Sequence, residues 1–205
     1  MISIEGFVLA GGRSRRMGRD KSNLLLGGKT LIDRAATALS AIADPIYAVG
    51  NLTSEITLLP IIHDEIVGGN ARGAIVGLYS ALLHARADWA AILACDLPFV
   101  SGELLQRMAA LTTVSASGSN GVAVILPRQP DGRIQPLCGL YQRGRCLAVV
   151  EQMLADEKWR LQDLPERVTS HIIPFAEISD LRGAEHFFDN LNTPDDYEAA
   201  IATLY

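Results

Sequence analysis

The stretch LAGGRSRRMGRDKS, residues 9–22, combines two adjacent glycines with a cluster of cationic side chains. Gly11 and Gly12 let backbone N–H groups approach a ligand closely, because no side chain intervenes. The cations can donate charge-assisted hydrogen bonds to phosphate oxygens. The spacing fits neither the Walker loop, because Lys21 does not follow Gly18 directly, nor the dinucleotide pattern, because the first two glycines are adjacent. The stretch predicts a phosphate-binding loop of another type; a solvated basic turn is the alternative.

Two carboxylates each follow an apolar run of residues. Asp64 ends the run LLPIIHD at 58–64, and Asp96 ends the run WAAILACD at 89–96. Mg²⁺ prefers oxygen ligands and is often held by one or two carboxylates together with substrate phosphates. We therefore expect Asp96 to bind Mg²⁺, and Asp64 to contact a ribose hydroxyl, a base edge or a second metal ion. For both residues the common alternative is an aspartate that only forms a turn.

The elements that must position these residues alternate between strand and helix. Continuous apolar runs predict strands at 4–10, 45–50, 58–64, 89–96 and 122–126. Helical spacing predicts helices at 30–43, 73–85 and 101–111, the last capped by Ser101. Later segments are predicted as extended at 133–141, helical at 145–156, strand at 170–175, and a final helix capped by Thr193.

This alternation is typical of an α/β domain with a mostly parallel sheet and helices on both faces, which is a three-layer fold. Ligands of such sheets bind outside the carboxyl ends of the strands. The glycine loop, Asp64 and Asp96 all follow predicted strands, so we expect them to meet at that edge. No linker divides the chain, which predicts one domain over residues 1–205.

Composition limits the classes of function. The chain has 205 residues, 49% of them hydrophobic, and a net charge of -5. The acidic balance argues against a general nucleic-acid surface, and the local cations indicate a small polyanion. No apolar run approaches the roughly 20 residues of a membrane helix, and the start does not resemble a secretory signal. The three cysteines contain no CxxC pair, so we expect a cytoplasmic protein with reduced thiols.

The first block, LAGGRSRRMGRDK, resembles the signature of the molybdenum cofactor guanylyltransferases, the MobA-like nucleotidyltransferases. The blocks GAIVGLYSAL, ACDLP, IQPLCGLY and NLNTPDD resemble later family blocks in the same order. The resemblance implies a Rossmann-like nucleotidyltransferase fold and an enzyme that transfers GMP from GTP to the phosphate of molybdopterin. Pyrophosphate would leave, the guanine dinucleotide form of the cofactor would result, and Mg²⁺ would be required.

The resemblance also implies roles for individual residues. Nucleotide-binding residues would be Leu9, Ala10, Gly11, Gly12, Lys21, Asn51, Asp64 and Asp96. Catalytic residues would be Arg16, Lys21 and Asp96, with Asp96 also the Mg²⁺ ligand. Acceptor-binding residues would be Gln135, Asn190 and Asn192. The nucleotide part would span about 1–126 and the acceptor part about 127–205. Partners would be GTP, molybdopterin and other molybdenum cofactor biosynthesis proteins, without nucleic acid or membrane.

Three other functions remain open at this point. Related cytidylyltransferases commonly begin Leu-Ala-Ala-Gly, whereas Gly11 lacks a Cβ atom and leaves room for a purine, which favours GTP over CTP. A nucleotide-binding regulator that has lost catalysis would be expected to have lost Lys21 or Asp96, and both are present. A pure interaction domain gives no reason for five cations beside two glycines.

Overall fold

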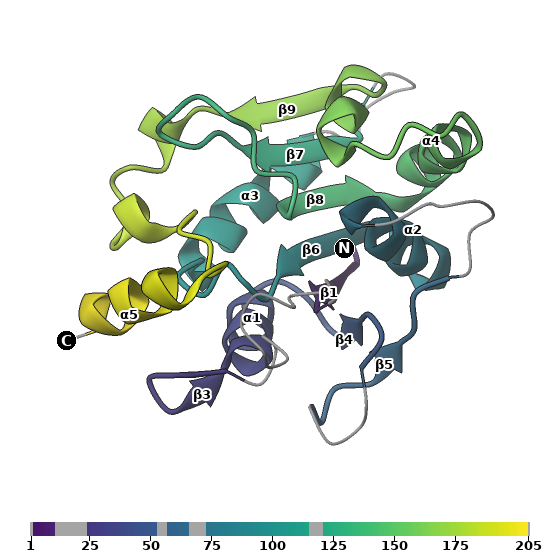
Figure 1. The fold of residues 1–205 in the computed structure, drawn as a ribbon. Coiled ribbons are helices and arrows are strands. Elements are labelled where there is room, and N and C mark those ends of the chain that lie inside the picture. Colours follow the sequence, from purple (N-terminus) through teal and green to yellow (C-terminus); the bar gives the residue numbers. More distant parts are fainter. Residues whose placement is uncertain (1, 11–23, 53–56, 66–72, 115–120, 205) are drawn as a thin grey trace.

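A seven-stranded sheet in the order β5-β4-β1-β6-β8-β7-β9 forms the centre of the computed structural model (Figure 1). The structure describes residues 2–10, 24–52, 57–65, 73–114 and 121–204. The strands are β1 (Ile4–Leu9), β4 (Ile46–Val49), β5 (Ile61–Ile62), β6 (Trp89–Ala94), β7 (Val124–Pro127), β8 (Cys138–Gln142) and β9 (Ser170–Ile173). β8 runs antiparallel to β6 and β7, and the other neighbouring pairs are parallel. The predicted mostly parallel sheet is confirmed.

Helices cover both faces of this sheet, which confirms the three-layer prediction. One face packs against α1 (Leu31–Leu39), α3 (Gly102–Val114) and α5 (Pro194–Thr203). The other packs against α2 (Ala74–His84) and α4 (Arg143–Ala155), as Figure 1 shows. Side chains alternate along β1, so Phe7 and Leu9 enter one core and Val8 enters the other. All of β6 is buried because both faces are covered.

Side-chain caps fix the starts of four helices; for α4 the Gln142 amide oxygen accepts from the Arg145 N–H at 2.7 Å. The Thr30 hydroxyl accepts a hydrogen bond from the Asp33 backbone N–H at 3.1 Å. Ser101 accepts from the Leu104 N–H at 3.2 Å, as its position predicts. Thr193 begins α5 with a full capping box, in which Asp196 closes the reciprocal bond. These caps satisfy N–H groups that have no partner within the helix.

Two predicted elements are shorter than their apolar runs by four residues or more. The strand expected at 58–64 is reduced to Ile61–Ile62, because Leu58 is fully exposed and Pro60 has no backbone N–H to pair. The helix expected at 30–43 ends at Leu39, after which the chain turns towards β4. Apolar composition predicted both elements but did not set their ends.

Several short elements were not predicted. A hairpin joins β2 (Leu25–Leu26) to β3 (Lys29–Thr30), and Gly27 and Gly28 in its turn have φ of 61° and 79°. The glycine pair is a turn signal that could have predicted it. Three 3₁₀ helices follow α4 and β9: η2 (Leu161–Glu166), η3 (Phe175–Glu177) and η4 (Ala184–His186). The polar loop expected at 115–121 lies outside the described residues except for Gly121.

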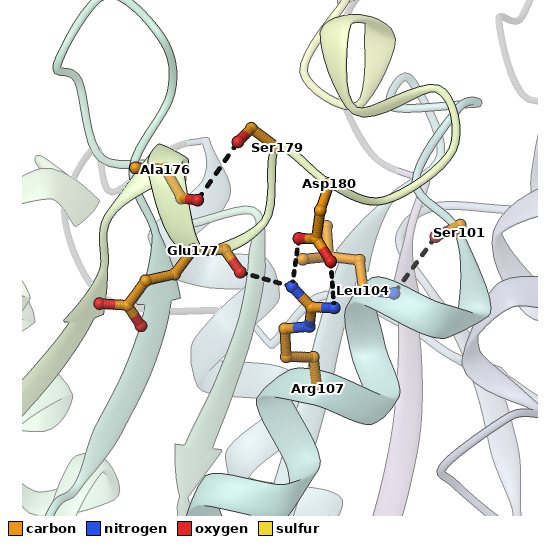
Figure 2. Close-up of polar contacts among 7 residues, drawn as sticks. All are labelled: Ser101, Leu104, Arg107, Ala176, Glu177, Ser179 and Asp180. Carbon is orange, nitrogen blue, oxygen red and sulfur yellow. Dashed lines mark hydrogen bonds and ion pairs between the residues drawn. The ribbon is translucent and has the colours of Figure 1, made fainter.

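An arginine on α3 anchors the segment that follows β9. Arg107 donates two hydrogen bonds to the carboxylate of Asp180, at 2.5 and 2.9 Å, and one to the Glu177 carbonyl oxygen at 2.5 Å. Figure 2 shows the guanidinium group facing both partners. A fork of this kind fixes orientation as well as distance. The contact holds the C-terminal part of the chain against the helix layer.

In the described ranges, no helix is long and apolar enough to cross a membrane.

Candidate active site at the carboxyl edge of the sheet

Backbone hydrogen bonds continue past the carboxyl ends of four neighbouring strands. The Gly50 N–H donates to the Ile62 oxygen at 3.0 Å, and the Ala10 N–H donates to the Val49 oxygen at 2.9 Å. The Cys95 N–H donates to the Leu9 oxygen at 3.0 Å. These bonds extend the parallel register by one residue beyond each strand. The chain segments that carry Ala10, Asn51, Asp64 and Asp96 therefore leave the sheet at one edge, where the sequence placed them.

Asp96 lies at the junction of this edge with the C-terminal segment. The Leu97 N–H closes a turn on the Ala94 oxygen at 3.2 Å, and the Leu191 N–H donates to the Asp96 carbonyl oxygen at 3.0 Å. The carboxylate atom Oδ1 of Asp96 is buried. An anionic oxygen below the surface at a ligand-binding edge fits a hard cation. Within the described residues, no cluster of three histidine, cysteine or acidic side chains could hold a metal ion.

Asp64 follows β5 and is half-buried. Burial raises the pKa of its carboxyl group, and the neighbouring His63 opposes that rise. In the part of the chain that the structure describes, Asp64 forms no ion pair. Among the described residues, the carboxylate is thus partly desolvated, and the positive charge of His63 offsets only part of that cost.

Ser80 on α2 fixes the chain directly after Asp64. Its side chain is fully buried, and its hydroxyl accepts a hydrogen bond from the Glu65 N–H at 2.8 Å. The same hydroxyl donates to the Val76 oxygen at 2.9 Å. Sequence reasoning missed Ser80, although a lone serine inside the apolar helix run GLYSALL is a signal for a buried polar contact.

Gln135 reaches the same edge because β8 runs antiparallel and begins there. The Ala94 N–H donates to the Leu137 oxygen at 2.8 Å, which joins the turn before β8 to the end of β6. The Gln135 side chain is buried, and its Oε1 accepts from the Leu137 N–H at 3.3 Å. This contact shapes the turn. In the structure, the Gln135 side chain therefore bonds to the backbone of its own turn at the end of β6.

Asn190 and Asn192 flank Leu191, so the backbone bond from Leu191 places them beside the Asp96 turn. Asn190 is half-buried and donates to the Phe188 oxygen at 3.3 Å. Asn192 is exposed, and its backbone N–H donates to the Asp196 carboxylate at 2.8 Å. Asn51 is also exposed, directly after Gly50, whose φ is 142°. These three amides lie at segments that border the edge.

The glycine loop itself lies outside the described residues, so Gly11, Gly12, Arg16 and Lys21 are not placed. The chain on either side of it is fixed. Ala10 is bonded to Val49 on one side, and on the other the Leu31 N–H donates to the Leu24 oxygen at 3.1 Å. The loop thus leaves β1 at the edge that carries Asp96.

Comparison with known proteins identifies the family of the chain. The model of the MobA-like NTP transferase domain matches residues 6–169. A probable molybdenum cofactor guanylyltransferase of Pelotomaculum thermopropionicum is 33% identical over 96% of this chain and 91% of its own. A probable molybdenum cofactor guanylyltransferase of Carboxydothermus hydrogenoformans is 34% identical over 93% of this chain and 91% of its own.

Solved structures show the same fold. The molybdopterin-guanine dinucleotide biosynthesis protein A of Archaeoglobus fulgidus has a TM-score of 0.79 at 23% identity and covers 98% of both chains. The 2-C-methyl-D-erythritol 4-phosphate cytidylyltransferase of Thermus thermophilus has a TM-score of 0.68 at 14% identity and covers 99% of both chains. The family resemblance in the sequence and the Rossmann-like nucleotidyltransferase fold are confirmed: this chain is a nucleotidyltransferase that belongs to the MobA-like NTP transferase family.

Proposed function

We propose that this enzyme transfers GMP from GTP to the phosphate of molybdopterin and releases pyrophosphate. The observation that carries the proposal is full-length similarity to relatives named molybdenum cofactor guanylyltransferase, at 33% and 34% identity. The product would be the guanine dinucleotide form of the cofactor. A cytoplasmic reaction with other cofactor-biosynthesis proteins as partners belongs to the same proposal.

The glycine loop would hold the triphosphate. Backbone N–H groups around Gly11 and Gly12 would approach the phosphates, and Arg16 and Lys21 would neutralise their charge. Transfer of a nucleotidyl group asks for in-line positioning and charge stabilisation, and little covalent chemistry. The attacking group is already a phosphate anion, so no general base is needed.

Asp96 would hold Mg²⁺ together with oxygen atoms of GTP. The ion would supply charge neutralisation at the phosphates. The turn closed by Leu97 supports this role because it orders the backbone at Asp96, and the buried Oδ1 atom is shielded from bulk water. β1 and β6 are neighbouring parallel strands, so the Asp96 turn and Ala10 lie at adjacent strand ends.

The nucleoside would lie towards β4 and β5. Leu9 and Ala10 would contribute backbone groups, and Asn51 and Asp64 would contribute side chains. Asp64 supports this assignment because a half-buried carboxylate without an ion pair in the described residues can accept hydrogen bonds from guanine or ribose.

The acceptor would lie on the other side of Asp96. Asn190 and Asn192 would contact it, and Gln135 would contribute through the turn that it shapes. This division assigns residues 1–126 mainly to the nucleotide and residues 127–205 mainly to the acceptor. Both parts share one sheet, so they form a single domain in this proposal.

A cytidylyl transfer is the second candidate, because cytidylyltransferases share the fold. The test is to incubate the protein with Mg²⁺, molybdopterin and each nucleoside triphosphate in turn, and to measure pyrophosphate. GTP should give acceptor-dependent release. If only CTP does so, the guanylyl assignment is wrong and the phosphate chemistry stands.

A further inference from the structure

Arg34 on α1 bridges two backbone segments at the edge of the candidate site. Its Nε donates to the Pro98 carbonyl oxygen and its Nη1 donates to the Leu26 carbonyl oxygen, each at 3.2 Å. The side chain is half-buried, and burial lowers the pKa of the guanidinium group. Among the ion pairs of the described ranges, none involves Arg34. In the described part of the chain, the Arg34 guanidinium group is thus held by two carbonyl oxygens.

The two carbonyl groups belong to the segments that carry the proposed chemistry. Leu26 lies in the hairpin that follows the glycine loop, and Pro98 lies two residues after Asp96. The same junction includes the C-terminal segment. The Tyr197 hydroxyl donates to the Leu25 oxygen at 2.5 Å, and Leu191 bonds to Asp96.

We infer that Arg34 is a positioning residue that holds the Asp96 turn in register with the chain leaving the phosphate loop. The inference rests on the proposed function, because it assigns the register a role in holding metal-bound nucleotide. Residues that orient the ligands of a metal site typically change metal affinity or activity by about 10–100-fold when they are replaced. A shift of about 1 Å between a carboxylate and the phosphates it serves can have a comparable effect.

Arginine suits this role better than lysine. Its planar group presents several N–H donors at fixed angles, so it can reach two carbonyl oxygens from different segments at once. A lysine ammonium is a compact charge at the end of a flexible stem, so it would bond well to only one of the two carbonyl oxygens. Arg34→Lys keeps the positive charge but weakens the double contact, whereas Arg34→Met removes both. Comparing the two variants therefore separates the effect of the double contact from the effect of the charge.

Arg107 provides a matched control. It also lies on a helix of the same layer and also ties that helix to a distant segment, through Asp180 and Glu177 (Figure 2). Its partners have no bond to the Asp96 turn in the described contacts. Arg107→Met should lower the melting temperature without changing the site, and it calibrates a purely structural loss.

The experiment measures three quantities on the full chain for Arg34→Met, Arg34→Lys and Arg107→Met. They are the hydrogen exchange of the Leu97 amide, the affinity for Mn²⁺ in the presence of GTP by electron paramagnetic resonance, and the Mg²⁺ concentration for half-maximal turnover. Arg34→Met should speed the exchange and weaken Mn²⁺ binding by about 10–100-fold. Arg34→Lys should fall between it and the wild type. Arg107→Met should match the wild type in all three.

Equal exchange and equal Mn²⁺ affinity in the Arg34 and Arg107 variants would overturn the inference. The two claims can fail separately. If the wild type binds Mn²⁺ and GTP more tightly than Arg34→Met but releases no pyrophosphate with molybdopterin, the role of Arg34 is supported and the proposed reaction is contradicted. Normal pyrophosphate release at the wild-type Mg²⁺ concentration in both Arg34 variants would contradict the role of Arg34 and would support the proposed reaction.

Discussion

Asp64 lies at the carboxyl edge of the sheet and Asp180 lies in the segment after β9, and their carboxyl groups have opposite pKa shifts. Burial raises the pKa of Asp64. Hydrogen bonds from Arg107 hold the pKa of Asp180 below its usual value. One aspartate is partly desolvated without an ion pair in the described residues, and the other is exposed with a bidentate partner.

This difference is the one expected between a carboxylate that serves the fold and one that binds a ligand. An exposed pair such as Arg107–Asp180 fixes one segment against another and leaves nothing for a substrate. The burial of Asp64 disfavours its charged form, so the folded state is less stable at neutral pH than it would be with this carboxylate in water. Such arrangements occur where binding requires groups that folding alone would not favour.

The largest expected effect is at Asp96, which lies with Asp64 at the carboxyl ends of the strands and is likewise proposed to bind a ligand. Asp96→Asn keeps the size of the side chain and removes the charge proposed to hold Mg²⁺. Turnover should fall by at least about 100-fold, as for other losses of transition-state charge stabilisation. The measurement is pyrophosphate release at rising Mg²⁺ concentrations. Full activity at ordinary Mg²⁺ would place Asp96 among the structural aspartates.

A smaller effect is expected at Asp64, with opposite signs for binding and stability. Asp64→Asn should raise the KM for GTP by about 10–100-fold, the range for a lost hydrogen bond to a charged group. The raised pKa of Asp64 means that its contribution to stability is present below the unfolded value of 3.8 and declines as pH rises through the folded value. The variant should therefore melt above the wild type at neutral pH, and this gain should shrink towards pH 4.

Melting curves from about pH 4 to 8 and GTP titrations check this prediction together. A variant that melts below the wild type at neutral pH and binds GTP normally would show that Asp64 is structural after all. Asp180→Asn is the control, because it replaces the same residue type outside the edge.

The smallest effect is expected at Asp180. Asp180→Asn removes an exposed ion pair, and such pairs contribute little. Because the pKa of Asp180 is lowered, its contribution is present above the unfolded value of 3.8 and is lost as pH falls through the folded value. The variant should melt slightly below the wild type at neutral pH, with unchanged KM and turnover. Reduced turnover at full stability would contradict the division between the two regions.

Much of the fold could be predicted from the sequence because both cores leave a periodic signal. Buried strands such as β6 are continuous apolar runs, and helix starts such as Ser101 and Thr193 carry recognisable caps. Strand length was less predictable. Burial at 58–64 depends on neighbours that are distant in sequence, and the paired part is only Ile61–Ile62.

The site could be predicted in part, for a related reason. Motifs placed Asp64 and Asp96 at strand ends, and parallel register then brings those ends together. Arg34 and Ser80 could not be identified as supports, because their partners are backbone groups of distant segments. Backbone partners leave no residue-type signal, so only the folded arrangement reveals them. The roles of Gly11, Arg16 and Lys21 stay predictions.

The proposed function requires the site at the carboxyl ends of the strands to bind GTP selectively and to transfer its GMP group to a pterin phosphate. The direct measurement is a competition in which GTP and CTP are supplied at equal concentration with Mg²⁺ and molybdopterin, and the products are separated by mass. The product should be almost entirely guanylylated, because a site built to hydrogen-bond one base rejects another strongly. A product that is mainly cytidylylated would contradict it.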